Sequence, residues 1–194
     1  MVNMSKNKTK TQYVDNKKFF SEIVEHKKKI DQAIRDEKEL PRIPEYIGKC
    51  ILLIAIGISR RPKFMNYSFK DEMISDGIEN CMMYFNNFNP NITQNPFAYF
   101  SEIIHWAFVR RILKEKKNRY ITYKYFQNQI DNSNEEYYQD DDGNNLISNK
   151  MYDNIDIFIV DFEEKEKQKI IQKRKKMKKA KAAKAKLNIL DIED

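Results

Sequence analysis

Apolar residues recur at intervals of three and four along most of this chain, a spacing that predicts helices rather than strands. The first helix is expected to begin near Asp15 or Asn16, either of which can cap free backbone N–H groups. Pro41 and Pro44 are expected to end this segment, because proline resists continued helix. The apolar positions of the segment are Phe20, Ile23, Val24, Ile30 and Ile34.

A second helix is expected from about Glu45, and it carries the most continuous apolar pattern of the chain. Leu52 and Leu53 widen its stripe until the stripe nearly encircles the helix, which indicates a central place in the fold. The stripe itself consists of Tyr46, Ile47, Cys50, Ile51, Ile54, Ala55 and Ile58.

A third helix is expected from Phe69 to Phe88, with Ser68 and Asp71 forming a capping box at its start. One face is apolar, and the opposite face is polar and largely acidic, with Met82 and Met83 at its margin. An ordinary solvated surface is the simplest interpretation of the acidic face. The apolar stripe comprises Ile74, Ile78, Cys81, Phe85 and Phe88. The polar face comprises Asp71, Glu72, Ser75, Asp76, Glu79 and Asn80.

A fourth helix is expected to start with Asn95 as its cap and Pro96 at its first position, and to continue to about Lys117. Unlike the other helices, it carries large apolar or aromatic side chains on two separate faces. The core stripe comprises Phe97, Phe100, Ile104, Ala107 and Phe108. A second, aromatic and basic stripe comprises Tyr99, Ile103, Trp106, Arg110, Leu113 and Lys117.

More cations and aromatic residues follow this second stripe. The cations are Arg111, Lys114, Lys116 and Arg119, and the aromatic cluster is Tyr120, Tyr123, Tyr125 and Phe126. Such interleaving suits single-stranded nucleic acid, whose phosphates meet cations while unstacked bases lie against aromatic rings. The alternative is that a second helix covers these aromatic residues, since aromatics at helical spacing are more often core. The residues alone leave both interpretations open.

Composition narrows the class of protein. With only 4 Gly and 5 Pro in 194 residues, the chain has too few turn-formers for a β-sandwich, and an all-α fold with one core is expected. The formal charge of +7 favours polyanionic partners. Cys50 and Cys81 lie in apolar helical patterns and are expected to be reduced core thiols.

Catalysis, cofactors and membrane insertion are not expected. The chain has no glycine-rich phosphate loop, no Cys–His arrangement and only two histidines, His26 and His105, so neither an enzyme nor a metal or other cofactor site is predicted. No apolar run is long enough to cross a bilayer, and the first residues lack the apolar region of a secretory signal. We therefore expect a cytoplasmic protein with no membrane partner.

The segment from Glu45 to Phe126 resembles the second conserved region of the sigma-70 family, and within that family the late-transcription sigma factors of T-even bacteriophages. Three helical segments in the family's order carry the resemblance: IGKCILLIAIGIS, DEMISDGIENCMMYFNNFNP and FAYFSEIIHWAFVRRILKEKKNR. In this family an acidic helix binds the clamp of RNA polymerase and the next helix melts the minus-10 element. The resemblance implies a compact helical domain over residues 13–126 that binds bacterial-type core RNA polymerase and opens AT-rich late promoters.

Carried over residue by residue, the resemblance assigns two sets of contacts. The clamp helices of the largest polymerase subunit would bind Glu72, Ser75, Asp76, Ile78, Glu79 and Met82. Promoter DNA, including the non-template single strand, would bind Tyr99, Trp106, Arg110, Arg111, Lys114, Lys117 and Arg119. One departure concerns melting, because the paired tryptophans of housekeeping sigma factors align with Glu102 and Ile103.

The remaining segments are polar, with two short apolar exceptions. Residues 1–12 are expected to be disordered, and residues 127–162 to form an acidic loop followed by a short packed strand or helix, Ile155 to Phe162. Residues 163–186 form a basic arm, either a sequence-independent DNA-binding arm or a solvated tether. No helix-turn-helix that could read a minus-35 element is recognisable after Phe126.

The last eight residues, 187–194, return to an apolar pattern beside acidic groups. They look like the C-terminal sliding-clamp-binding peptide of the late sigma factors, through Leu187, Ile189, Leu190 and Ile192. Such a tether would raise the effective concentration of polymerase at a promoter. Two other classes stay open for the whole chain: a helical DNA-binding adaptor that never binds polymerase, and an anti-sigma protein or polymerase inhibitor.

Overall fold

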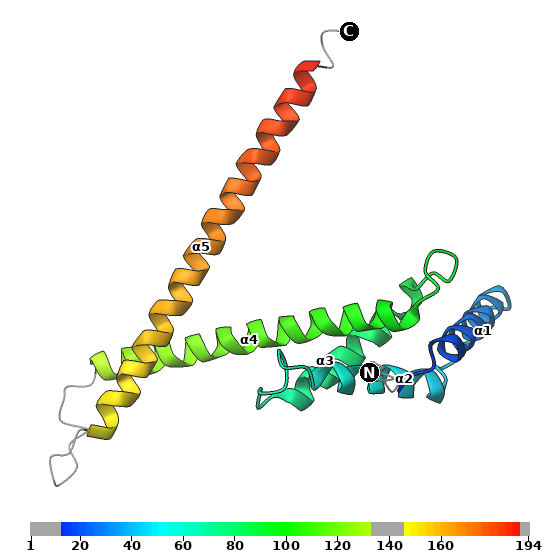
Figure 1. The fold of residues 1–194 in the computed structure, drawn as a ribbon, viewed down its shortest axis with the longest axis horizontal. Helices are drawn as coiled ribbons and strands as arrows, with labels where there is room; N and C mark the ends of the chain where they lie inside the picture. Colours follow the sequence, from blue (N-terminus) through cyan, green and yellow to red (C-terminus); the bar gives the residue numbers. More distant parts are fainter. Residues whose placement is uncertain (1–12, 133–145, 191–194) are drawn as a thin grey trace, which may run out of the picture. The chain divides into compact units, whose positions relative to one another are not determined.

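The fold is known from a computed structural model that describes residues 13–132 and 146–190 (Figure 1). Among these residues there are helices and no strand, so the predicted all-α class is confirmed. The expectation for residues 1–12 falls outside the described part of the chain. The helices are α1 (Asn16–Arg35), α2 (Glu45–Ser59), α3 (Lys70–Met83), the 3-10 helix η1 (Phe85–Asn87), α4 (Pro96–Asn132) and α5 (Leu146–Leu190).

The chain divides into two compact units, Met1–Lys114 and Glu115–Asp194, and α4 contributes to both. The first unit contains α1, α2, α3, η1 and the first half of α4. The second contains the rest of α4 and α5. No helix in the described ranges is long and apolar enough to cross a membrane.

Helix α1 begins where its cap was predicted but ends earlier than expected. The Asp15 Oδ1 accepts hydrogen bonds from the backbone N–H groups of Lys17 (3.0 Å) and Lys18 (3.2 Å). The helix stops at Arg35, well before the prolines, because Glu37 adopts a left-handed conformation (φ 52°). The backbone N–H of Lys38 then bonds back to the helix, closing a Schellman motif that satisfies the last carbonyls.

The apolar pattern of α1 is shifted relative to the prediction. Phe19, Ile23 and His26 are its buried residues, whereas Ile34 is 62% exposed. Helix α2 starts at Glu45 as predicted, and it packs against both α1 and α3. Its buried residues are Ile47, Cys50, Ile51, Ile54, Ala55, Ile58 and Ser59.

Helix α3 differs from its prediction at both ends and on its buried face. The predicted capping box is wrong, since Phe69 occupies the cap position and no side chain caps the helix. The buried line runs through Met73, Gly77 and Cys81, while Ile74 and Ile78 are only partly buried. Gly77 explains this, because a Cβ there would lie 3.0 Å from Phe108 Cε1 and 3.2 Å from Ile104 Cγ2. The missing side chain lets α3 approach α4 closely.

A cluster of phenylalanine rings joins α1, η1 and α4 in the core of the first unit. The ring of Phe100 lies 5.6 Å from that of Phe19, 6.0 Å from that of Phe85 and 6.1 Å from that of Phe88, measured between centroids. All four side chains are at most 2% exposed. Large buried rings contribute strongly to core stability, so this cluster fixes how α1 and η1 pack against α4.

Helix α4 starts as predicted, with the Asn95 Oδ1 accepting a hydrogen bond from the backbone N–H of Ala98 (3.0 Å). It does not end at Lys117 but continues to Asn132. In the second unit its C-terminal half packs against α5 around the buried side chains of Ile155 and Ile159. The apolar segment 155–162 is therefore helical, which decides between the strand and the helix left open by the sequence.

The acidic loop expected within residues 127–162 is the stretch Asn132 to Asn145, of which only Asn132, the last residue of α4, belongs to the described part. Residues up to Asn132 and from Leu146 onwards are helical, and the stretch between them falls outside the described residues. The basic arm, residues 163–186, also lies on α5.

Candidate functional site

The expected polymerase-binding residues all lie on α3, but they differ in exposure. Glu72, Ser75 and Glu79 are exposed and follow each other at steps of three and four, so they form one line on the helix. Ile78 and Met82 are partly buried and pack against the core of the first unit. The freely accessible part of the expected surface is thus the acidic line.

Asp76 and Arg111 form an ion pair between α3 and α4. The Arg111 Nε lies 2.8 Å from Asp76 Oδ2, and its Nη2 donates a hydrogen bond to Asp76 Oδ1 at 3.2 Å. The two side chains are 31% (Asp76) and 17% (Arg111) exposed, so the pair is substantially shielded from water. The resemblance assigns Asp76 to polymerase and Arg111 to DNA, whereas in this structure they bind each other. Contact with either partner would compete with that ion pair.

A second contact between α3 and α4 involves the neighbouring arginine. The Nη2 of Arg110 donates a hydrogen bond of 2.6 Å to the Asn80 Oδ1, and Arg110 remains exposed. This bond holds the guanidinium beside the surface of α4 that carries the aromatic stripe. The ion pair and the Arg110 bond together fix the relative position of the acidic line and that stripe.

The aromatic stripe of α4 borders an open groove of about 370 Å³ in the first unit. Trp106 is 53% exposed on this surface, and its ring meets that of His105 edge-on at 5.6 Å. The residues lining the groove are Tyr84, Tyr99, Glu102, Ile103, Trp106 and Arg110. Four of them belong to the stripe predicted from the sequence.

Tyr99 anchors one end of the groove. Its hydroxyl donates a hydrogen bond of 3.1 Å to the backbone carbonyl of Tyr84, and its ring packs edge-on against Phe88 (5.2 Å) and Phe100 (5.1 Å). Partial burial raises the pKa of the Tyr99 hydroxyl, so this group stays neutral at physiological pH. The ring is therefore held by the core, and only part of it faces the groove.

Sequence reasoning missed two residues that line the groove, Tyr84 and Glu102. Glu102 stands one turn before Trp106 on the same helix, and that spacing could have revealed it. Tyr84 follows α3, and no local pattern indicates that it would reach α4. Glu102 places a carboxylate at an edge of an otherwise aromatic and cationic surface.

The remaining expected DNA-binding cations are divided between the units. Lys114 is exposed at the end of the first unit, and Lys117 and Arg119 are exposed in the second. The guanidinium of Arg119 lies 5.7 Å from the ring centroid of Phe158 on α5, a distance suited to a cation–π contact. Arg119 therefore has a partner within the second unit.

Much of the aromatic cluster at the end of α4 packs against α5. The ring of Tyr120 stacks on that of Phe162 at 4.6 Å, and its hydroxyl donates a hydrogen bond of 2.9 Å to Glu163 Oε1. Tyr123 meets Phe158 edge-on at 5.3 Å. For these tyrosines the covering helix, not the nucleic-acid platform, is the correct interpretation. Tyr125 is 66% exposed.

Buried titratable groups in the first unit are suited to packing rather than to chemistry. Burial raises the pKa of the Cys81 thiol to about 12, and Cys50 is likewise buried and free, which confirms the prediction of reduced core thiols. Burial lowers the pKa of His26 and of His105. Within the described ranges, no group of three or more His, Cys, Asp or Glu side chains could hold a metal ion.

The side chains of the expected clamp-binding residues lie outside the described part of the chain. Leu187, Ile189 and Leu190 fall within the backbone bounds of α5, but their side chains lie outside the described part, as does Ile192 altogether.

Comparison of the chain with protein-family models and with curated proteins finds no match to either.

Proposed function

We propose that this chain is a sigma factor that binds bacterial-type core RNA polymerase and melts an AT-rich, minus-10-like late promoter. The observation that carries the proposal is the groove on α4 with a half-exposed tryptophan between Tyr99 and Arg110. A helical monomer gains no folding stability from leaving such a ring exposed. An unstacked base does gain from it, because base–aromatic stacking contributes about 1–3 kcal/mol per base.

The acidic line on α3 supplies the second half of the proposal. Glu72, Ser75 and Glu79 are exposed, and a cationic helical clamp would find two carboxylates on one side of the helix. The hydrogen bond between Asn80 and Arg110 connects this helix to the groove helix. Binding at α3 would therefore hold the groove at a fixed place relative to the polymerase.

Opening of promoter DNA would then proceed by capture of flipped bases. Unstacking costs a few kcal/mol, which stacking on Trp106 and attraction of phosphate to Arg110 would offset. The positions that align with the family's paired tryptophans are Glu102, exposed, and Ile103, partly buried. Trp106 is thus the ring that would do the stacking, and melting by this chain alone is expected to be weak.

Two segments that follow the first unit, α5 and the C-terminal residues, also have a place in the proposed function. Among the described residues that follow α4 there is α5 and no helix-turn-helix. This agrees with a sigma factor that reads no minus-35 element. The C-terminal residues 187–194 would couple the factor to a sliding clamp. We place the protein in the cytoplasm of a bacterial host, where such a polymerase works.

Binding and initiation are tested together. Purified protein is mixed with bacterial core polymerase and analysed by size exclusion, and the complex is then assayed by runoff transcription on a supercoiled template carrying a TATAAATA-like element. We expect a complex and correctly placed starts. A complex without starts, even after a clamp or co-activator is added, favours an anti-sigma protein or inhibitor. No complex favours a DNA-binding adaptor.

Two variants separate the two surfaces. Glu79→Arg is expected to weaken polymerase binding at least tenfold, whereas Glu39→Arg, the same change at an exposed position after α1, leaves it unchanged. Asp76→Arg is a poorer probe, because it also breaks the ion pair with Arg111. Trp106→Ala is expected to abolish starts with polymerase binding retained, and Ile92→Ala, exposed outside the groove and the acidic face, is its control.

A further inference from the structure

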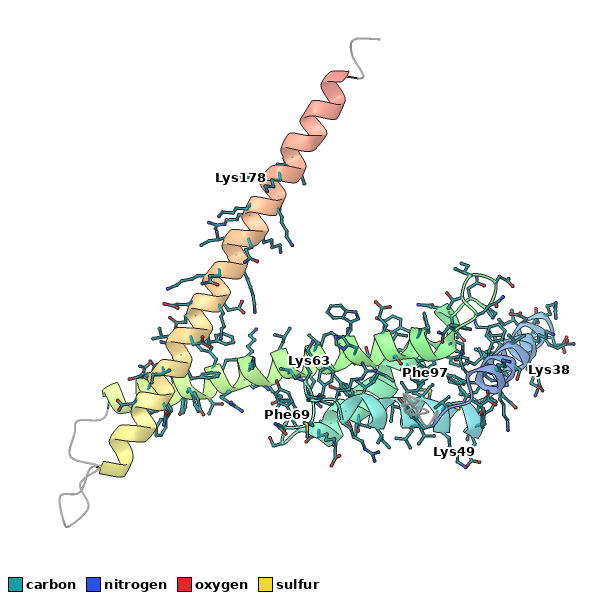
Figure 2. All side chains as sticks on the ribbon, viewed as in Figure 1. Lys38, Lys49, Lys63, Phe69, Phe97 and Lys178 are labelled. Atoms are coloured by element: carbon teal, nitrogen blue, oxygen red, sulfur yellow. The ribbon has the colours of Figure 1, made fainter. Side chains whose placement is uncertain are left out.

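Residues 167–181 of α5 form a dense run of cations on an exposed stretch of the helix. Every residue from Lys167 to Lys181 is exposed, and the segment contains nine basic residues and no acidic one. Side chains project from α5 around the labelled Lys178 (Figure 2). Lys169 pairs with Glu166 at 2.6 Å, and beyond it no carboxylate follows within the segment. The cations are Lys167, Lys169, Lys173, Arg174, Lys175, Lys176, Lys178, Lys179 and Lys181.

These cations surround the helix instead of forming one face. Ile170 and Met177, seven residues apart, share one side of the helix. Arg174 lies on the same side one turn after Ile170, and Lys181 lies there one turn after Met177. A helix that lies on a lipid surface needs a continuous apolar face, which this segment lacks. The arrangement instead suits a partner that presents negative charge on more than one side of the helix.

The helix is under internal repulsion. Like charges three or four residues apart, such as Lys175 and Lys179, destabilise a helix by about 0.2–0.5 kcal/mol each. From Lys167 to Lys181 no side chain is buried to compensate for this. A bound polyanion would remove the repulsion, so binding and helix stability are expected to be coupled.

The residue types and helical shape of the segment favour one kind of nucleic acid over the others. Single strands are held by stacking on aromatic rings, and no aromatic residue occurs after Phe162. The major groove of double-stranded RNA is too narrow for a helix, whereas that of B-DNA admits one between two phosphate backbones. Fifteen helical residues extend for about 22 Å, along which duplex DNA carries roughly one charge per 1.7 Å.

We propose that residues Lys167 to Lys181 of α5 bind duplex DNA through its phosphates, without sequence preference and with the helix in the major groove. In this proposal the basic arm is a DNA-binding arm rather than a solvated tether. The proposal is independent of the proposed sigma function, which concerns α3, α4 and an opened single strand. It requires no polymerase and no promoter sequence.

The test uses the full chain and a GC-rich duplex of about 30 base pairs without an AT-rich element, a length that spans the helix. Affinity is measured by fluorescence anisotropy across a salt series. In the test variant Lys173, Arg174, Lys175 and Lys176 are all replaced by Gln. We expect its affinity to fall at least tenfold at 0.1 M salt. The slope of log affinity against log salt concentration should become less steep by about three to four, because each lost phosphate contact contributes about 0.9.

A second variant controls for net charge, with Lys28, Lys29, Lys38 and Lys49, all exposed in the first unit, replaced by Gln. We expect its affinity to stay within twofold of the original. Equal losses in both variants would overturn the proposal, because net charge alone would then explain binding. In the variant altered at residues 173–176, a larger loss of affinity for an oligo-dT strand or for anionic phospholipid vesicles than for the duplex would overturn it as well.

Circular dichroism tests the helical part of the proposal. Duplex DNA is expected to increase the helical signal at 222 nm of the original chain, and to do so less for the variant altered at residues 173–176. The reason is that phosphates neutralise repulsion along the helix. An equal response of the two chains would contradict binding by this segment as a helix.

Discussion

The two units of this protein use their apolar residues differently. In the first unit four helices enclose a continuous core, with large side chains such as Phe19, Phe100 and Phe108 completely buried. In the described part of the second unit only Ile155 and Ile159 are buried, and α4 contacts α5 mainly through a few ring pairs, hydrogen bonds and an ion pair. Both units are helical, but only the first has a core that fixes side chains within it.

This difference separates the tasks that each unit can perform. A groove that receives a specific base must hold Tyr99, Trp106 and Arg110 in fixed positions, and the core beneath α4 supplies that rigidity. A helix that binds phosphates without sequence preference needs charge rather than fixed geometry. The thin second unit is sufficient for that role.

The largest expected effect comes from breaking the core of the first unit. Phe100→Ala removes a ring that contacts Phe19, Phe85 and Phe88, and we expect the free energy of unfolding to fall by about 3–5 kcal/mol. Thermal unfolding followed by circular dichroism measures this. Ile92→Ala, at a position 82% exposed, should change stability by less than about 0.5 kcal/mol. Similar losses in both variants would contradict the core described here.

Gly48 and Gly77 in the first unit differ in how closely other side chains approach them. Gly77→Ala forces a Cβ to within 3.0 Å of Phe108, and we expect it to lower the free energy of unfolding by about 1–3 kcal/mol. Gly48→Ala meets nothing within 4 Å, so its better helix propensity should raise that free energy by up to about 1 kcal/mol. Chemical denaturation compares the two. A stabilising Gly77→Ala would show that α3 and α4 are less closely packed.

A smaller and local effect is expected in the second unit. Tyr120→Ala removes the stack on Phe162 and the hydrogen bond to Glu163, and we expect the α4–α5 contact to weaken by about 1 kcal/mol. Amide hydrogen exchange should become faster in residues 153–163 and stay unchanged in α2. Tyr125→Ala, at an exposed position, is the control. Faster exchange in α2 as well would mean that the two units unfold together.

The smallest effect concerns pH and His26. Burial, helped by the nearby Lys29, lowers the pKa of His26 below 6.5, so below pH 6.5 the unfolded chain binds the proton more readily than the folded one. The free energy of unfolding of the first unit should therefore decrease as the pH falls through this range. His26→Gln should make the free energy of unfolding depend less on pH. His105→Gln should leave the part of this pH dependence that comes from His26 unchanged. An unchanged pH profile in His26→Gln would exclude this origin.

Several features could be read from the sequence because their causes are local. Asp15 and Asn95 cap their helices through bonds to residues two or three positions away, and Pro44 directly precedes the second helix. The small number of Gly and Pro residues correctly predicted an all-α fold. The exposed stripe around Trp106 was also predictable, because residues on one helix share a face by spacing alone.

Other features depended on partners distant in the chain. Ile74 and Met73 fit a helical stripe equally well, and the close approach of Phe108 to Gly77 selected Met73 for the core. Arg111 is a cation like its neighbours in the sequence, but its bond to Asp76 spans 35 positions. The sequence by itself determined which residues share a face of a helix. Only the tertiary structure decided which of those surfaces are covered, because burial depends on elements that local spacing does not specify.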